Sequence, residues 1–158
     1  MIFYRNRFYL ALDIISILGI VLSIVSFILA YFSQGDIPTH FNAQGNVDSY
    51  GNPLEMGLLP LISIVLFVSL TIAENKTGCI NVPFRLSENG YEYLRNNCWR
   101  LMKQIKFCLM TLMGYISISS LLISKDLMES ISNWVMFVCI GLLFACLIRF
   151  LYKLYNWN

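Results

Sequence analysis

Four stretches of this sequence contain no charged residue and are each long enough to cross a membrane. They cover residues 14–35, 56–73, 107–124 and 130–148, which are 22, 18, 18 and 19 residues long. A spanning helix needs about 20 apolar residues, within a range of about 17–25. Because lipid offers no hydrogen-bond partner to the backbone, each span must be helical. The pattern predicts an all-α, polytopic membrane protein with four transmembrane helices.

The scarcity of charge excludes the other common classes of chain. Charged residues make up 13% of the sequence and hydrophobic residues 58%, whereas a soluble domain carries roughly 25% charged residues. Disorder is excluded because it requires low hydrophobicity. We expect a single membrane domain over residues 1–158. Its first part, about 10–75, holds two spans, and its second part, about 76–158, holds a basic cytoplasmic linker and a second helical hairpin.

The basic residues are distributed very unequally between the two ends of the predicted spans. Ten of the eleven Lys and Arg residues fall before the first span, between the second and third, or after the fourth, and only Lys125 falls on the other side. The positive-inside rule then places both termini and the middle loop in the cytoplasm. We therefore expect a multi-pass membrane protein whose first loop, about residues 33–53, faces outward.

The middle loop ends in a basic, aromatic segment that leads into the third span. Asn89 and Glu92 have the spacing of a helix-capping box, and Arg95, Arg100, Lys103 and Lys106 follow. The ordinary interpretation is that this helix anchors the chain to anionic lipid. Because the positive-inside rule already requires these charges, we expect no nucleic-acid partner.

The first span carries one acidic residue and a row of small ones. Asp13 is a possible intramembrane polar site, since such a carboxylate is a functional candidate by default. It also lies in the first turns, where the helix dipole favours an anion and water is near. Small residues recur at helical spacing along this span, and we expect them to pack inward against a neighbouring helix: Ser16, Gly19, Ser23 and Ser26.

The first loop contains the only histidine, His40. Pro38 favours an extended residue before it, and the segment 43–46 predicts a turn in which Gly45 can take a positive φ. The loop can then fold back and place His40 beside Asp48 on the opposite arm. Such a cluster could fix the loop as a hydrogen-bond network, contact a ligand or peptide, or hold a divalent cation.

Metal binding and catalysis are the weaker interpretations of this loop. One imidazole and one carboxylate make a poor metal site. Catalysis would need a nucleophile beside His40, and Thr39 and Ser49 are the only candidates in the loop. We expect no metal, no cofactor, no catalytic residue and no enzyme activity.

The loop resembles the signature of a bacterial membrane domain of unknown function. The pattern P-x-H-[FW]-N-x-x-G-x-x-D is filled here, between two predicted spans, by Pro38, His40, Phe41, Asn42, Gly45 and Asp48. That domain forms the N-terminal part of SdpI-like membrane proteins, which confer immunity to a secreted peptide toxin. The resemblance covers about the first half of the chain and implies that these six residues are its motif or ligand-binding positions. It also implies a location in the bacterial cytoplasmic (inner) membrane.

Two functions follow as expectations. The first is a small immunity or envelope-sensing protein whose outer loop contacts an extracellular peptide, toxin or other ligand. The second is a transporter-like or accessory component of an oligomeric complex, in which Asp13 and the small residues line a path. In both cases the lipid bilayer is the principal partner, and further copies of this chain are a candidate partner.

Overall fold

The computed structural model describes residues 7–33, 35–76 and 87–155. Four long helices dominate the described chain and confirm the predicted all-α architecture. All four are long and apolar enough to cross a membrane. They are α1 (Arg7–Ser33), α2 (Leu58–Asn75), α3 (Glu88–Ser124) and α4 (Asn133–Tyr155).

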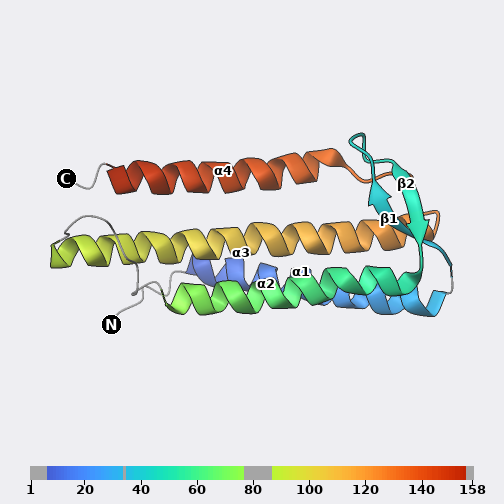
Figure 1. The fold of residues 1–158 in the computed structure, drawn as a ribbon, viewed down its shortest axis with the longest axis horizontal. Coiled ribbons are helices and arrows are strands. Elements are labelled where there is room, and N and C mark those ends of the chain that lie inside the picture. The colour runs from blue at the N-terminus through green and yellow to red at the C-terminus, as the bar shows by residue number, and fades with distance from the viewer. Residues whose placement is uncertain (1–6, 34, 77–86, 156–158) are drawn as a thin grey trace.

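The helices run side by side, and α3 packs against each of the other three (Figure 1). The contact between α1 and α3 is the most extensive of these. The beginning of α1, the end of α2, the beginning of α3 and the end of α4 lie at one end of the bundle. A small β-hairpin covers the opposite end. The first of these ends is called the basic end below, and the end covered by the hairpin is called the hairpin end.

The backbones of α1 and α3 touch where two glycines meet. The Cα and carbonyl oxygen of Gly19 lie 2.9 and 2.8 Å from the position a Cβ would take on Gly114. The predicted inward stripe of α1 is confirmed, because Ser16, Gly19, Ser23 and Ser26 are all buried. The hydroxyls of Ser23 and Ser117 are 2.6 Å apart across the same interface. Small side chains allow this close approach, as is usual between membrane helices.

The third helix is continuous from the basic end to the hairpin end. The segment before the predicted third span is therefore helical, as expected, but its cap differs. Ser87 is the N-cap, and its Oγ accepts a hydrogen bond from the backbone N–H of Gly90. The expected cap Asn89 lies inside the first turn instead, because the serine two residues earlier already satisfies that turn's free N–H group. In α2, Pro60 lies in the first turn, where its missing N–H costs nothing.

The first loop forms an antiparallel hairpin rather than an irregular loop. Strands β1 (Ile37–Phe41) and β2 (Val47–Gly51) pair with Ile37 opposite Gly51 and Phe41 opposite Val47. The β-branched and aromatic residues Ile37, Thr39 and Phe41 in β1, and Val47 and Tyr50 in β2, favour these short strands. A 3-10 turn, η1 (Pro53–Gly57), then leads into α2, and Asn52 and Glu55 form a reciprocal capping box at its start.

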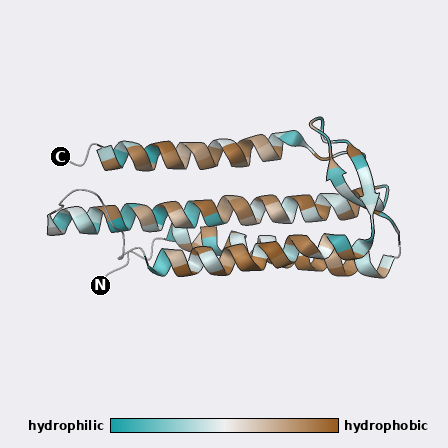
Figure 2. Ribbon diagram, viewed as in Figure 1, coloured by the Kyte–Doolittle hydropathy of each residue, from teal (hydrophilic) through white to brown (hydrophobic). Residues whose placement is uncertain are grey.

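A small apolar core holds the hairpin against the helices. Ala30 of α1, Ile37 of β1, Met56 of η1 and Leu121 of α3 are all buried together, with Phe27 packed beside them. Elsewhere the helices expose large apolar side chains over much of their length. Figure 2 shows that hydrophobic residues make up most of these helices. A soluble protein rarely exposes such an apolar surface, so these faces fit contact with lipid. The chain is a small multi-pass membrane protein.

Candidate functional site

The histidine and aspartate of the hairpin are in direct contact. His40 Nδ1 lies 2.6 Å from Asp48 Oδ1, across the two strands. The expected meeting of these side chains on opposite arms is thus what the structure shows. The pair is open to solvent, with 69% of the His40 side chain and 42% of the Asp48 side chain exposed. The carboxylate orients the imidazole and leaves its other nitrogen, Nε2, directed away from Asp48.

Two other motif residues build the turn that joins the strands. Asn42 Oδ1 accepts hydrogen bonds from the backbone N–H groups of Gln44 and Asn46, each at 3.0 Å. Gly45 has φ +86°, a left-handed conformation that favours glycine. Asn42 and Gly45 therefore determine the shape of the turn, and for Gly45 this is the role that the sequence predicted.

The remaining two motif residues support the hairpin from its helix-facing side. Pro38 is buried next to the fully buried Ile37. Phe41 is half-buried and pairs with Val47 at the end of the strands. Of the six motif residues, His40 and Asp48 alone combine solvent exposure with ionisable chemistry. The other four hold them in place.

The turn of the hairpin is bound to the connection between α3 and α4. The backbone N–H of Ile131 donates to the carbonyl oxygen of Gly45 at 2.9 Å. The side-chain amide of Asn133 donates to the carbonyl oxygen of Ala43 at 2.7 Å. Tyr115 of α3 holds the same connection, because its hydroxyl accepts from the N–H of Ser132 at 2.7 Å. Sequence reasoning missed this contact, since no local pattern links segments about 90 residues apart.

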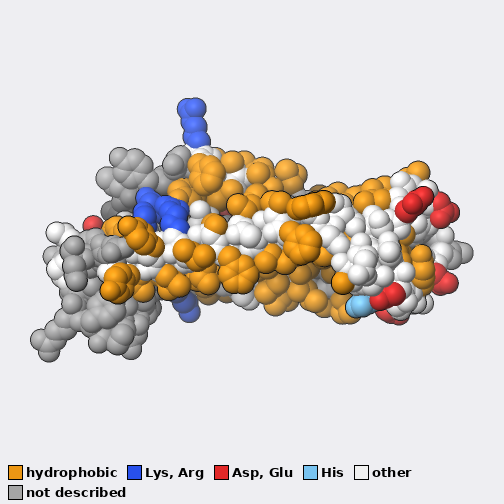
Figure 3. Space-filling model, turned by 90° about the horizontal axis from the view of Figure 1, so that it is seen from above, with side chains coloured by type: hydrophobic (Ala, Val, Ile, Leu, Met, Phe, Trp, Pro, Cys, Tyr) orange, Lys and Arg blue, Asp and Glu red, His pale blue; other side chains and the backbone are white. Residues whose placement is uncertain are grey.

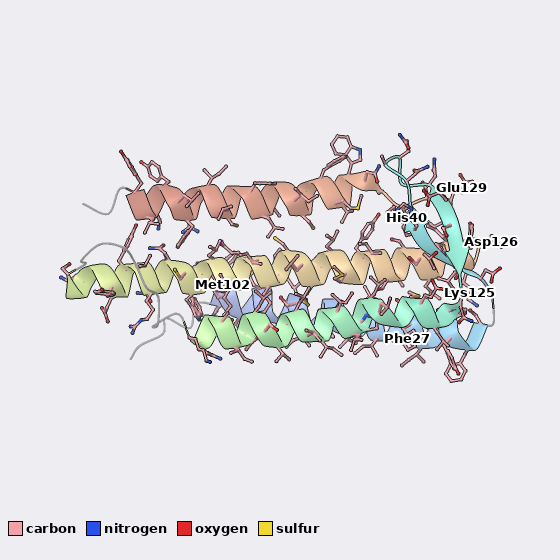
Figure 4. The ribbon with its side chains drawn as sticks, viewed as in Figure 1. Phe27, His40, Met102, Lys125, Asp126 and Glu129 are labelled. Atoms are coloured by element: carbon pink, nitrogen blue, oxygen red, sulfur yellow. The ribbon has the colours of Figure 1, made fainter. Side chains whose placement is uncertain are left out.

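Acidic side chains gather at the hairpin end. Figure 3 shows acidic side chains and the histidine there, with Lys and Arg nearer the other end. Figure 4 places His40, Asp126 and Glu129 at this end, with Lys125 beside them. The acidic residues carried by the hairpin and its neighbouring turns in the described chain are Asp36, Asp48, Glu55, Asp126 and Glu129.

A groove of about 670 Å³ lies beside the hairpin, between the end of α1 and the η1 turn. Tyr31, Phe32 and Leu54 contribute apolar walls, and Asp36 and Asn52 contribute polar ones. A space of this size is within the range of pockets that bind small molecules. The groove and the His40–Asp48 pair belong to the same end of the molecule.

A second polar cluster lies between the helices, toward the basic end. It consists of Asp13 on α1, Glu74 on α2, and Lys103 and Lys106 on α3, and is called the charge quartet below. Lys106 Nζ is 3.0 Å from Asp13 Oδ1 and 2.9 Å from Glu74 Oε2. Lys103 Nζ is 2.7 Å from Glu74 Oε1 and also pairs with Asp13. Each lysine therefore pairs with both carboxylates.

The quartet revises the interpretation of the basic helix. The side chains of Lys103 and Lys106 are only 10% and 3% exposed, so they do not contact lipid headgroups as the sequence suggested. They turn inward because the carboxylates of Asp13 and Glu74 offset their charge. The side chain of Asp13, which is 24% exposed, is the least buried of the four in the quartet. The sequence did not indicate an ion-pair role for Glu74, because a carboxylate at the end of a span is common at the membrane interface.

Among the residues that the structure describes, no group of three or more His, Cys, Asp or Glu side chains could hold a metal ion. At the hairpin, the described metal-ligating side chains in contact are His40 and Asp48.

Residues 17–64 match the model of a domain of unknown function, DUF1648. The matched segment runs from the middle of α1, through the hairpin, into the first turns of α2, and so contains all six motif residues. Asp13, α3 and α4 lie outside it. No curated protein and no solved structure matched the chain. The chain is thus similar to this domain over its hairpin-bearing segment.

Proposed function

We propose that the hairpin is the outward-facing recognition element of a small bacterial cytoplasmic-membrane protein. It contacts an extracellular peptide or another ligand, in toxin immunity or in sensing of the cell envelope. Both termini and the basic end face the cytoplasm in this proposal. Support comes from the basic residues, ten of which lie toward one side and one toward the other, in the manner of the positive-inside rule.

The exposed His40–Asp48 pair is the observation that carries the proposal. An exposed ion pair contributes only about 0–1 kcal/mol to stability, so folding gives little reason to keep it. The hairpin beneath it is nevertheless tightly held, by the buried Ile37 on one side and by Ile131 and Asn133 on the other. A fixed scaffold that presents ionisable groups to water is the usual construction of a binding site.

The hairpin is also placed to report what it binds. Its strands continue directly from α1 and lead through η1 to α2, and its turn is hydrogen-bonded to the connection between α3 and α4. A ligand that shifts the hairpin therefore pulls on both halves of the bundle. The adjoining groove at Tyr31 and Leu54 offers apolar contact area for a peptide side chain.

The comparison and the resemblance support the same proposal. The DUF1648 match covers residues 17–64, and the loop resembles that of SdpI-like immunity proteins. The transporter-like alternative receives less support. The small residues of α1 pack against α3, and Asp13 is paired with two lysines, so neither lines an open path in a single chain.

A double-mutant cycle with His40→Ala and Asp48→Ala tests the proposal. Membrane abundance and survival under peptide-toxin or envelope stress are measured for each variant in the native host. We expect normal abundance in every variant. Protection or signalling should fall equally in both single variants, and should not fall further in the double variant. Ser49→Ala, on the same strand, is the matched control and should behave as wild type.

Two results would contradict the proposal. Loss of abundance in each single variant would assign the pair a structural role. Normal protection and signalling in the double variant would remove the pair from recognition altogether.

A further inference from the structure

Three basic side chains from two helices meet at the basic end. Arg100 of α3 and Arg149 and Lys153 of α4 line one shallow cleft between these helices. Among the ion pairs of the described side chains, none includes any of the three. Lys153 lies over the ring of Tyr93, 5.9 Å from its centre, which is a neutral partner. The three residues are called the basic triad below.

Helix geometry places the triad just beyond the apolar part of the bundle. A helix rises 1.5 Å per residue, so Lys106 lies about 27 Å, and Arg100 about 36 Å, from Ser124 at the hairpin end of α3. The hydrocarbon core of a bilayer is about 30 Å thick. The charge quartet thus lies near the inner boundary of the core, and Arg100 lies one turn past Lys103, at the depth of the headgroups.

The convergence of the triad is not explained by membrane topology alone. The positive-inside rule requires basic residues on this side, but not that three of them from separate helices share a cleft. Three positive charges that line the same cleft repel each other. Other buried charges at this end are compensated in the quartet, and Arg95 is paired with Glu92. An anion on the cleft would offset the repulsion.

We propose that the basic triad binds the phosphate headgroup of an anionic phospholipid from the cytoplasmic leaflet. The cleft also has apolar lining, because Leu101, Cys146 and Phe150 line it beside the three cations and the polar Asn97 and Gln104. Cations beside apolar side chains fit a phosphate headgroup together with the first part of its acyl chains. The enclosed space is only about 10 Å³, which is too small to enclose any ligand, so the headgroup lies on the surface of the cleft. Basic clefts between spanning helices bind anionic lipid elsewhere.

Lipid binding by the purified protein tests the site. Native mass spectrometry measures how much dioleoylphosphatidylglycerol and dioleoylphosphatidylcholine the protein retains, and titration gives the affinity for each. Wild type should prefer the anionic lipid. The triple variant Arg100→Gln, Arg149→Gln, Lys153→Gln should lose that preference by about tenfold or more, given roughly a fivefold contribution from each basic residue near an anionic surface. Replacing the two arginines by lysine should largely preserve it.

The matched control removes three positive charges from the same end but outside the cleft. It is the triple variant Arg7→Gln, Lys76→Gln, Arg95→Gln, which should keep the preference. Equal losses in the two triple variants would indicate general surface attraction and overturn the site, as would an unchanged preference in the triad variant. If inorganic phosphate displaces the anionic lipid, a free anion is the occupant and the lipid assignment is wrong. The single exposed change Arg149→Gln repeats the test with least disturbance to folding, and none of these outcomes depends on the hairpin.

Discussion

The carbonyl oxygen of Gly45 accepts a hydrogen bond from the backbone N–H of Ile131 at 2.9 Å. This bond joins the turn of the hairpin to the connection between α3 and α4. Gly45 also has φ +86°, and a Cβ on it would overlap the carbonyl oxygen of Ile131. One residue therefore combines a turn conformation and a docking contact that both require the absence of a side chain.

Gly45→Ala should detach the hairpin turn while leaving the helices assembled. The left-handed conformation costs a non-glycine residue about 1–2 kcal/mol, and the overlap with Ile131 adds to this. We expect faster hydrogen exchange over residues 41–47 and 130–133, measured on the purified protein by mass spectrometry, with little change along α1 and α3.

Gly35→Ala is the matched control for this change. A Cβ at Gly35 would meet nothing within 4 Å, so its exchange pattern should equal that of wild type. Unchanged protection in Gly45→Ala would show that the turn tolerates a side chain and that the docking contact is weak.

Gly19→Val should disrupt the packing of α1 against α3. A Cβ at Gly19 would overlap the carbonyl oxygen of Met110. This oxygen belongs to the backbone of α3 and cannot move away as a side chain could. Overpacking of this kind costs about 1–3 kcal/mol or more. We expect a lower melting temperature in detergent and lower membrane abundance, measured by thermal unfolding and immunoblot.

Gly141→Val provides the comparison on α4. A Cβ at Gly141 would meet nothing within 4 Å, and the residue is exposed on the lipid-facing surface. Its melting temperature should stay near that of wild type. Equal destabilisation by both changes would attribute the effect to valine in a helix rather than to the contact between α1 and α3.

Much of the fold could be predicted because its determinants are local in the sequence. Charge-free runs indicated the four helices, since only helices satisfy the backbone in lipid. The small residues of α1 indicated the face that packs. At the site, Gly45 indicated the turn, and the turn brought His40 and Asp48 together. The pairing of two short strands was not foreseen, because five-residue strands leave a weak pattern.

The contacts between distant segments could not be predicted from the sequence alone. Lys103 and Lys106 were interpreted as lipid anchors, since any basic residue at this depth satisfies the positive-inside rule. Their inward direction depends on Asp13 and Glu74, which lie on two other helices. The same reason applies to the hydrogen bond between Gly45 and Ile131, because no residue pattern near the turn indicates which loop packs against it.

The orientation in the membrane stays a prediction, and cysteine labelling tests it. The hairpin should face outward and the beginning of α3 inward. In a background without the five native cysteines, Ser49→Cys should react with a membrane-impermeant maleimide in intact cells. Asn96→Cys, which is exposed on α3, should react only after the cells are opened. Labelling of Asn96→Cys in intact cells would reverse the topology.

Lys106→Met should destabilise the bundle more than any comparable surface change. The substitution leaves Lys103 as the only lysine of the quartet, so the buried carboxylate of Glu74 and the partly buried one of Asp13 share one cation. Removing one partner from a buried ion pair costs about 3–5 kcal/mol, because the remaining charge stays unpaired away from water. The thermal unfolding temperature in detergent, and membrane abundance in cells, should both fall.

A second change distinguishes charge imbalance from loss of packing. In the double variant Glu74→Gln, Lys106→Met the quartet is neutral again, with Asp13 paired to Lys103, so much of the lost stability should return. Lys125→Met, at the hairpin end where the lysine is exposed, removes the same side chain outside the quartet and should have little effect. If the double variant is as unstable as the sum of its single changes, the quartet does not act as a unit, because independent sites are additive and coupled ones are not.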